Sequence, residues 1–215
     1  MNVRLYTYFR SSAAFRVRIA LNLKGLTYEP AFVHLAKGEH RAPGYGAVNP
    51  QALVPTLEDS GTRYTQSLAI IEYLDETHPG VPLLPKDAPG RARVRSLSLL
   101  VACEIHPLNN LRVLQHLKRA LGQNDEQVNH WYRHWIADGL ARFEADLAGA
   151  HAGGRFCHGD APTMADCCLV PQIFNAQRYQ CDTAPYPATM RVFAECMKLD
   201  AFDRAQPARQ PDADN

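Results

Sequence analysis

Residues 66–74 read QSLAIIEYL, and residues 53–57 shortly before them read LVPTL. Leu68, Ile71 and Leu74 recur at helical spacing, and Ser67 stands where an N-cap is expected, so the pattern predicts that a helix begins here. The N–H groups of a helix's first turn attract an anion. An ordinary capped surface helix would explain the same residues, and both interpretations stay open at this point.

The segment before this helix predicts a backbone edge. Val54–Pro55 ends an extended stretch that begins at Pro50, and a cis proline there would turn Val54 outward to pair with an extended peptide. A backbone edge beside an anion-attracting helix start suits a small peptide-like ligand with a free carboxylate.

Alternating extended and helical patterns run from the start of the chain to about Leu84. In chain order they predict a strand at 3–8, a helix at 11–24 ended by Gly25, a strand at 27–34, a polar loop at 36–45, strands at 54–58 and 63–65 joined by a tight turn, and the helix from Ser67. This order, βαβ followed by ββα, is that of a thioredoxin-like domain.

A proline-rich connector separates this part from an all-helical remainder. Residues 79–85 contain three prolines, Pro79, Pro82 and Pro85, which excludes helix and strand in this segment. We therefore predict a stiff connector here and domains at 1–84 and 85–215. Apolar residues step by three or four from Val94 to Leu111, and the run from Met164 to Tyr179 is apolar almost all round, as in the central helix of a bundle. Thr163 and Asp166 fit a capping box at its start, and the polar tail 207–215 is predicted to be frayed.

Composition limits the functional classes. The 215 residues are 46% apolar, and 23 basic against 22 acidic residues leave a net charge of +1, which favours neither nucleic acid nor a membrane as partner. No apolar run is long enough to span a membrane. Six cysteines lack metal-ligand spacing, so we interpret them as reduced core thiols of a cytoplasmic protein without a metal. They are Cys103, Cys157, Cys167, Cys168, Cys181 and Cys196.

Chemistry is predicted first at residues 9–16, FRSSAAFR, where a strand meets a helix. One of the hydroxyls of Ser11 and Ser12 is expected to cap the helix, which leaves the other to act on a ligand. A hydroxyl donor at the positive end of a helix lowers the pKa of a thiol. Since no cysteine precedes Cys103, a sulfur at this place would belong to a cofactor.

A second polar group lies at residues 105–112, IHPLNNLR. On a helix bent by Pro107, His106, Asn109 and Asn110 share one arc, whereas Arg112 falls among the apolar positions. Solvated side chains on a helix surface would explain the same residues, but the combination favours a polar pocket between the domains.

Two further residues are ambiguous from the sequence. Arg178, at the end of the apolar helix, either complements the helix dipole or meets a ligand. His40 lies in a polar loop that does not distinguish a functional residue from a surface histidine.

Five segments together resemble the zeta class of glutathione transferases and, more narrowly, the maleylacetoacetate and maleylpyruvate isomerases. The resemblance extends from Val3 to about Gln210. It implies a homodimer of two-domain subunits, glutathione as cofactor and a small dicarboxylate as substrate, with cis–trans isomerisation of maleyl keto acids from aromatic catabolism as the activity. The segments are 10–25, 49–55, 66–74, 105–110 and 163–166.

The resemblance also implies roles for individual residues. Ser11 is placed against the glutathione sulfur with Ser12 beside it, and Val54 pairs through its backbone with the cysteinyl unit. The remaining assignments are Gln66 and Ser67 to the γ-glutamyl carboxylate and His40, His106 and Asn110 to further cofactor contacts, to which we add Arg112. The isomerisation itself also needs cations for the substrate carboxylates and donors for oxygens that gain charge. Our candidates are Arg10, Arg112 and Arg178 for the first role, and His106 with backbone N–H groups for the second.

The chain departs from the family pattern at two positions. Ala13 stands where a cysteine is usual, which leaves isomerisation intact because the hydroxyl and the helix start stabilise the thiolate. His106 replaces a frequent glutamine and, with Arg112 near it, favours the short, doubly acidic maleylpyruvate. A general glutathione S-transferase for electrophiles is the alternative, although it would need an apolar second pocket, and a non-catalytic member would lack the serine chemistry.

Overall fold

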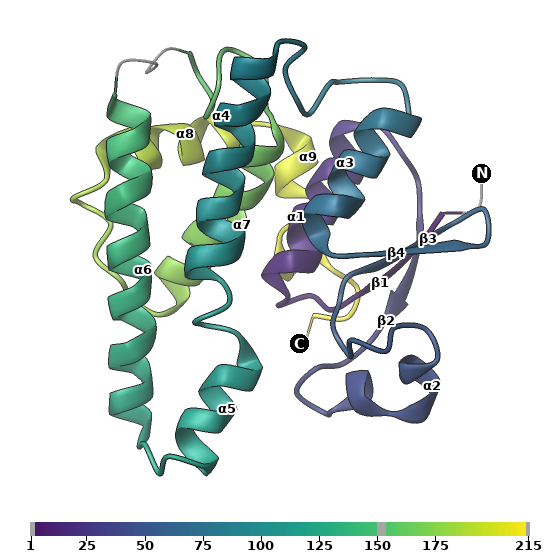
Figure 1. Cartoon of the computed structure of the whole chain (residues 1–215), viewed down its shortest axis with the longest axis vertical. Helices are drawn as coiled ribbons and strands as arrows, with labels where there is room; N and C mark the ends of the chain where they lie inside the picture. The colour runs from purple at the N-terminus through teal and green to yellow at the C-terminus, as the bar shows by residue number, and fades with distance from the viewer. Residues whose placement is uncertain (1–2, 150–153, 214–215) are drawn as a thin grey trace. The chain divides into compact units, whose positions relative to one another are not determined.

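The computed structural model describes residues 3–149 and 154–213, and its course is drawn in Figure 1. The chain divides into two compact units, Met1–Leu84 with Met197–Asn215, and Pro85–Cys196. The sequence-based division placed the whole stretch 85–215 in the helical domain. In the structure the last segment packs with the first unit instead.

The first unit contains a four-stranded mixed sheet in the order β2-β1-β3-β4. β1 pairs in parallel with β2 and antiparallel with β3, and β3 pairs antiparallel with β4. The predicted thioredoxin-like order is confirmed; β1, β2 and β3 are shorter than expected, and β4 is one residue longer. A tight turn joins the last two, where Ser60 and Gly61 have φ of 52° and 81°, the left-handed values that such hairpin turns require. The strands are β1 (Val3–Thr7), β2 (Glu29–Phe32), β3 (Thr56–Asp59) and β4 (Thr62–Thr65).

Two long helices, α1 (Ser12–Leu23) and α3 (Ser67–Thr77), pack against each other in this unit (Figure 1). Gly25, with φ of 67°, lies just beyond the end of α1, because a residue without Cβ adopts this backbone conformation most easily. Of the apolar stripe predicted for α3, Ile71 and Leu74 are buried, Leu68 is half-buried, and Ile70 is buried in addition. In α1 every residue from Ala14 to Leu21 is buried.

Short helices occupy the segment that was predicted to be a plain polar loop. They are η1 (Glu39–Arg41) and α2 (Pro43–Gly46), whose first turn begins with a proline, a residue preorganised for that position. The Tyr45 ring of α2 lies 5.8 Å from the ring of Tyr6. Because Leu5 and Tyr6 point to opposite faces of β1, α2 covers the sheet face opposite to that of Leu5.

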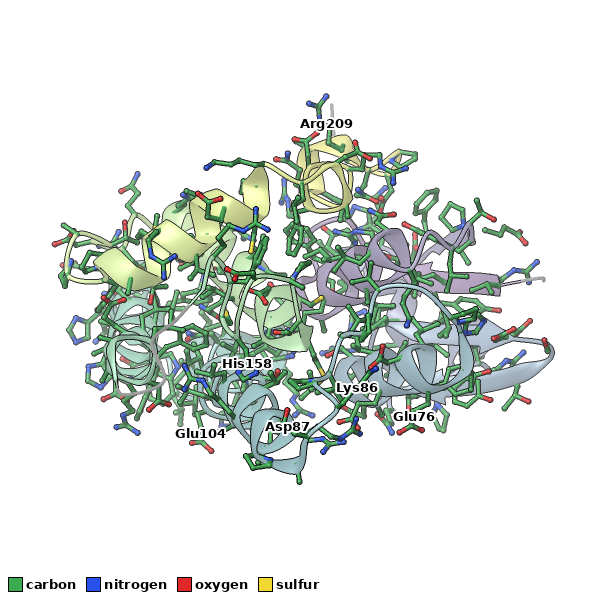
Figure 2. The ribbon with its side chains drawn as sticks, turned by 90° about the horizontal axis from the view of Figure 1, so that it is seen from above. Glu76, Lys86, Asp87, Glu104, His158 and Arg209 are labelled. Carbon is green, nitrogen blue, oxygen red and sulfur yellow. The ribbon has the colours of Figure 1, made fainter. Side chains whose placement is uncertain are left out.

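The C-terminal segment is anchored to the first unit. It contains α9 (Asp200–Asp203) and η3 (Pro207–Arg209), the latter marked by Arg209 in Figure 2. The Phe9 N–H donates to Asp212 Oδ2 at 2.9 Å, and Ala213 packs against an apolar cluster of this unit. The prediction of a frayed tail is therefore wrong for residues 207–213, while residues 214–215 lie outside the described part.

The second unit is helical, as predicted. α7 contacts α4 and η2, a π-helix that continues α4, and η2 also contacts α6. Asp87 (Figure 2) caps α4 by accepting the Gly90 N–H at 2.8 Å. The elements are α4 (Ala88–Leu99), η2 (Leu100–Ile105), α5 (Leu111–Arg119), α6 (Asp125–Ala148), α7 (Met164–Arg178) and α8 (Pro187–Met197).

α7 is the buried helix of this unit, and its predicted capping box is confirmed. The Thr163 N–H and Oγ1 donate to Asp166 Oδ2 at 2.7 and 2.9 Å, and the Cys157 N–H donates to Asp166 Oδ1 at 2.9 Å. Burial raises the pKa of Asp166, although these bonds act in the opposite direction. Their number explains how a fully buried carboxyl is tolerated.

The six thiols are free, but only four lie in the core. Cys157, Cys167, Cys168 and Cys196 are buried, whereas Cys181 is half-buried and Cys103 exposed. The core prediction is wrong for Cys103 because the buried positions of η2 are Val101 and Ile105, and a residue midway between them points outward. Among the described residues, no helix combines the length and apolarity needed to cross a membrane.

Candidate functional site

The start of α1 is built around Ser11, which takes the N-cap position with φ of −72° and ψ of 113°. Its Oγ accepts the Ala14 N–H at 3.2 Å, so the hydroxyl proton is directed away from the helix and suits donation to a ligand. Ser12 is the first helical residue and is 8% exposed. The expected division between a capping and a second serine is thus resolved, with Ser11 as the cap.

The backbone before Ser11 is held by Arg18, a completely buried residue. Its guanidinium donates to Thr7 Oγ1 at 3.0 Å, to the Tyr8 and Phe9 carbonyl oxygens at 3.3 and 3.1 Å, and to the Ala205 carbonyl at 3.0 Å. Burial lowers the pKa of Arg18 to about 10, which leaves it a cation at neutral pH. Buried charge of this kind is stable only when it is fully hydrogen-bonded, so these bonds position the loop.

Arg10 lies in that loop and is exposed, with its guanidinium carbon 4.8 Å from the centre of the Phe9 ring. Together with the Asp212 bond to the Phe9 N–H, the Arg18 contacts fix both polar backbone groups of Phe9.

The start of α3 differs from the prediction by one residue. Gln66, with φ of 68° and ψ of 115°, takes the N-cap position without a side-chain capping bond, and Ser67 is the first helical residue. The prediction of Ser67 as N-cap is wrong because the chain turns from β4 into the helix at Gln66, whose φ is positive. The first-turn N–H groups are left without a cap from the Gln66 side chain, as an anion site requires.

The Ser67 hydroxyl is oriented from another helix. Its Oγ accepts Arg16 Nη1 at 3.2 Å, and both side chains are buried, with 7% and 2% exposed. Since the oxygen accepts this bond, the hydroxyl proton is available to donate. The guanidinium also adds positive charge to the helix start.

Val54 is connected to both helix starts. The Val54–Pro55 peptide is cis, as anticipated, and β3 begins only at Thr56, so the polar backbone groups of Val54 lie outside the sheet ladder. The Leu53 carbonyl accepts bonds from Tyr45 Oη at 2.6 Å and Asn49 Nδ2 at 2.8 Å.

Two contacts bring these parts together. Gln66 Nε2 donates to Gln51 Oε1 at 2.8 Å, which ties the start of α3 to the segment that carries Val54. The Val54 side chain packs in one apolar cluster with Tyr8 and Phe9, next to Ser11 in the chain. Ser11, Val54, Gln66 and Ser67 are therefore supported by one connected set of contacts.

His40 is buried, 8% exposed, which argues against the plain surface histidine that the sequence left open as one alternative. Its Nδ1 has no hydrogen-bond partner among the described residues. Burial and the neighbouring Arg41 cation lower the pKa of His40, so the imidazole is neutral at pH 7. A buried ring nitrogen of this kind is a group that a ligand would satisfy.

In the second unit, residues 105–112 do not form the single kinked helix that was predicted. η2 ends at Ile105, a turn follows, and α5 begins at Leu111 with Asn110 as N-cap, whose Oδ1 accepts the Arg112 N–H at 3.2 Å. Pro107 cannot continue the helical bonding, and Asn110 restarts it. The common arc of His106, Asn109 and Asn110 is therefore lost.

The new helix also changes the position of Arg112. It is exposed in the first turn of α5, and its placement on a buried face is wrong. His106 is half-buried beside the end of η2 and donates its N–H to the Val101 carbonyl at 3.0 Å.

Arg178 is the last residue of α7 and is exposed, with its guanidinium carbon 5.2 Å from the centre of the Tyr179 ring. The Tyr179 ring stacks on Tyr132 with centroids 3.5 Å apart and planes inclined by 11°. A stacked pair thus supports the end of α7 and orients this cation.

The supporting residues were not identified from the sequence. Arg16 and Arg18 sit in an otherwise apolar helix, AAFRVRIAL, and since a buried arginine must be paired, that pattern is a usable signal. Asp212 bonds to a residue 203 positions away, and no local pattern indicates such a contact.

Comparison with known proteins identifies the class. Residues 10–77 match the family model of the glutathione S-transferase N-terminal domain. The chain is 49% identical to the maleylpyruvate isomerase of a Ralstonia species over 211 residues, which covers 98% of this chain and 100% of that protein. The chain therefore belongs to the zeta class of glutathione S-transferases, in the family of maleylpyruvate and maleylacetoacetate isomerases.

Two solved structures are similar over nearly the full length. The holo structure of a maleylpyruvate isomerase, a bacterial zeta-class glutathione S-transferase, has a TM-score of 0.96 at 49% identity and covers 98% of this chain and 100% of its own. A maleylacetoacetate isomerase from Methylobacterium extorquens AM1, solved with malonate and glutathione, has a TM-score of 0.95 at 45% identity, with coverages of 99% and 100%. The predicted fold class and family are confirmed.

Proposed function

We propose that the protein is a glutathione-dependent cis–trans isomerase that converts maleylpyruvate to fumarylpyruvate, or maleylacetoacetate to fumarylacetoacetate. One observation carries the proposal. Ser11 and Ser67 lie at two helix starts of one unit, and each hydroxyl accepts one internal hydrogen bond, from Ala14 N–H and from Arg16. Each therefore offers a proton to a negatively charged atom of a ligand.

The residues of the first unit fit glutathione. The γ-glutamyl carboxylate suits the start of α3, where the Ser67 hydroxyl and uncapped N–H groups are donors, and Gln66 provides a further amide. The Val54 backbone lies outside the ladder and suits the cysteinyl unit, as in strand-like peptide binding. The unpartnered Nδ1 of His40 is a further group for the cofactor.

When bound, glutathione supplies the thiolate that adds to the cis double bond and so allows rotation about it. The chain must lower the thiol pKa, and Ser11 does so by donating its hydroxyl proton to sulfur at the positive end of α1. Ser12, one residue further, is the second candidate for this role.

The substrate residues are proposed from what the isomerisation of a dicarboxylate requires. Arg10, Arg112 and Arg178 are exposed guanidinium groups assigned to the substrate carboxylates, and His106 is assigned as donor to oxygens that gain charge. Arg112, His106 and Asn110 are also assigned to the cofactor. This number of cations favours maleylpyruvate, whose two carboxylates lie close together.

The partners and location follow the family resemblance. We expect a homodimer in the cytoplasm, and the six free thiols agree with a reducing compartment. A dicarboxylate substrate agrees with the malonate in the Methylobacterium relative.

Retention on immobilised glutathione, followed by parallel steady-state assays, tests the proposal. Maleylpyruvate is expected to show the highest kcat/KM, with maleylacetoacetate slower and a chlorinated aromatic electrophile slowest. A chlorinated aromatic that exceeds both maleyl acids would overturn the isomerase proposal in favour of a general transferase.

A further inference from the structure

α6 is the long helix of the second unit, and its course is drawn in Figure 1. Four aromatic rings of this helix form a continuous patch. His130 and His134 are separated by one helical turn, with ring centroids 6.4 Å apart and planes inclined by 20°. Trp131 and Trp135 form a second pair with centroids 5.6 Å apart, and His134 lies 4.9 Å from Trp135. None of these residues belongs to the site described above.

The patch lines an open hollow of about 620 Å³, together with Glu126 and two glutamines. Its base is rigid for two reasons. α6 begins with a capping box between Asn124 and Gln127, and Trp131 Nε1 donates to the Leu108 carbonyl at 2.8 Å. Both histidines are exposed on this firm helix.

We propose that His130 and His134 form a binding site for a divalent transition metal ion of the Ni²⁺, Cu²⁺ or Zn²⁺ type. Side chains at i and i+4 share one helix face, and neutral imidazole is the ligand that these ions prefer. Two ring nitrogens that bind one ion with metal–nitrogen bonds of about 2.0–2.1 Å must lie closer to each other than the 6.4 Å that now separates the two ring centroids. Rotation of two exposed side chains on a fixed helix brings them together.

The charges around the pair favour a cation. Glu126 lies one turn before His130 on the same face and is exposed. Arg133, which precedes His134 in the chain, is directed toward another segment, because its Nε donates to the Tyr179 carbonyl at 2.8 Å. Asp138, one turn after His134, is paired with Arg142 at 2.9 Å.

The pair is a two-ligand site. Within residues 3–149 and 154–213, no group of three or more His, Cys, Asp or Glu side chains is placed to hold a metal ion. Water would complete the coordination shell, so the ion exchanges readily and binds more weakly than a structural zinc. Affinity is expected to follow the order in which Cu²⁺ exceeds Ni²⁺ and Zn²⁺.

The protein carries its own reporter for this site, because its only two tryptophans lie in the patch. Titration of the metal-free full chain with Ni²⁺ should quench tryptophan fluorescence to saturation, and Zn²⁺, which has no partly filled d shell, should reverse the quenching by competition. Ni²⁺ is preferred as the probe because the six free thiols would reduce Cu²⁺.

His130→Asn and His134→Asn should each weaken the Ni²⁺ affinity by about tenfold or more, which is at least the cost of losing an outer-shell partner. The double variant should show no saturable quenching. His158→Asn is the matched control, since His158 (Figure 2) lies outside the patch and its loss should leave the titration unchanged.

Circular dichroism of each variant checks that the helices are retained. Quenching that stays unchanged in both single variants, or that falls equally in His158→Asn, would overturn the proposal.

Discussion

A serine oxygen accepts one hydrogen bond at each helix start, that of Ser11 as the N-cap of α1 and that of Ser67 as the first residue of α3, but the donors have different origins. At α1 the donor is the Ala14 N–H of the same helix, whereas at α3 it is the Arg16 guanidinium of another helix. Ser11 uses a first-turn N–H for capping and offers one hydroxyl proton. The start of α3 has no capping side chain and keeps several donors for one anion.

The two helix starts are therefore suited to different roles in glutathione binding. A single O–H donor suits one atom whose charge must be stabilised, such as a sulfur, and so controls reactivity. Several N–H donors beside a buried cation suit a carboxylate and so control affinity. Substitutions at a helix start, at a residue that supports one, and at a residue outside both test this difference.

The largest effect is expected from Arg18→Met, which removes the support of the loop before Ser11. The Phe9 and Ala205 carbonyls and Thr7 Oγ1 lose the Arg18 donor, while the Tyr8 carbonyl keeps the Ser11 N–H at 3.0 Å. We expect the free energy of unfolding to fall by about 3–5 kcal/mol. Denaturant unfolding measures it. The control Arg63→Met removes an exposed pair with Glu58 and should cost less than about 1 kcal/mol; equal losses in the two variants would contradict the positioning role of Arg18.

Arg178→Met tests whether substrate turnover can be impaired without weakening glutathione binding, which we assign to the two helix starts. Loss of a charged partner of the substrate carboxylate should lower kcat/KM. The expected rise in the activation free energy is about 2–4 kcal/mol. Glutathione affinity should stay within about twofold, a free-energy change well under 1 kcal/mol. Steady-state kinetics with maleylpyruvate and calorimetry with glutathione separate the two quantities, and an unchanged kcat/KM would remove Arg178 from the site. Arg142→Met, at an exposed pair on α6, is the control.

Ser67→Ala should weaken glutathione binding by about 1.5–3 kcal/mol, because a charged acceptor loses one hydroxyl donor. The fold should persist, since Arg16 keeps its place in the core. Calorimetry measures the affinity, and Ser96→Ala, at an exposed position of α4, provides the comparison. Affinity that matches the unmodified protein would show that the carboxylate binds elsewhere.

The smallest effect is expected at Asp212, the C-terminal partner of Phe9. Asp212→Ala removes the acceptor of the Phe9 N–H and should cost about 0.5–1.5 kcal/mol of stability. Asp212→Asn keeps an acceptor oxygen and should cost less. Unfolding curves that rank the two variants in the opposite order would mean that the charge, rather than the hydrogen bond, anchors the tail.

The same comparison explains what the sequence was able to predict. The α1 start was predicted at Ser11, which is the N-cap before the first helical residue Ser12, and the choice of cap between the two serines was left open. The contact that decides this choice, from the Ala14 N–H to Ser11 Oγ, is local. The α3 start was off by one residue because the left-handed backbone of Gln66 and the bond from Arg16 depend on how strand and helices pack. Sequence patterns report local geometry well and tertiary contacts poorly.

The other differences have similar causes. The prediction continued one helix through Pro107, whereas a new helix begins after Asn110. Arg112 was therefore assigned to a buried face although it is exposed. The polarity of its loop left the role of His40 open, and the burial of this residue within η1 does not follow from composition. The tail was judged by its composition, but Asp212 accepts a bond from Phe9, which lies 203 positions away in the chain.

The central claim is that Ser11 controls the thiol and Ser67 controls affinity. Ultraviolet titration of the thiolate of bound glutathione, in the unmodified protein and in the two alanine variants, tests it most directly. Ser11→Ala should raise the pKa of the bound thiol by about 1–2, the equivalent of one charge-assisted hydrogen bond, with affinity nearly unchanged. Ser67→Ala should lower affinity and leave that pKa in place. An unchanged pKa in Ser11→Ala, or an equal rise in both variants, would contradict the account, and a rise only in Ser12→Ala would move the role to the neighbouring serine.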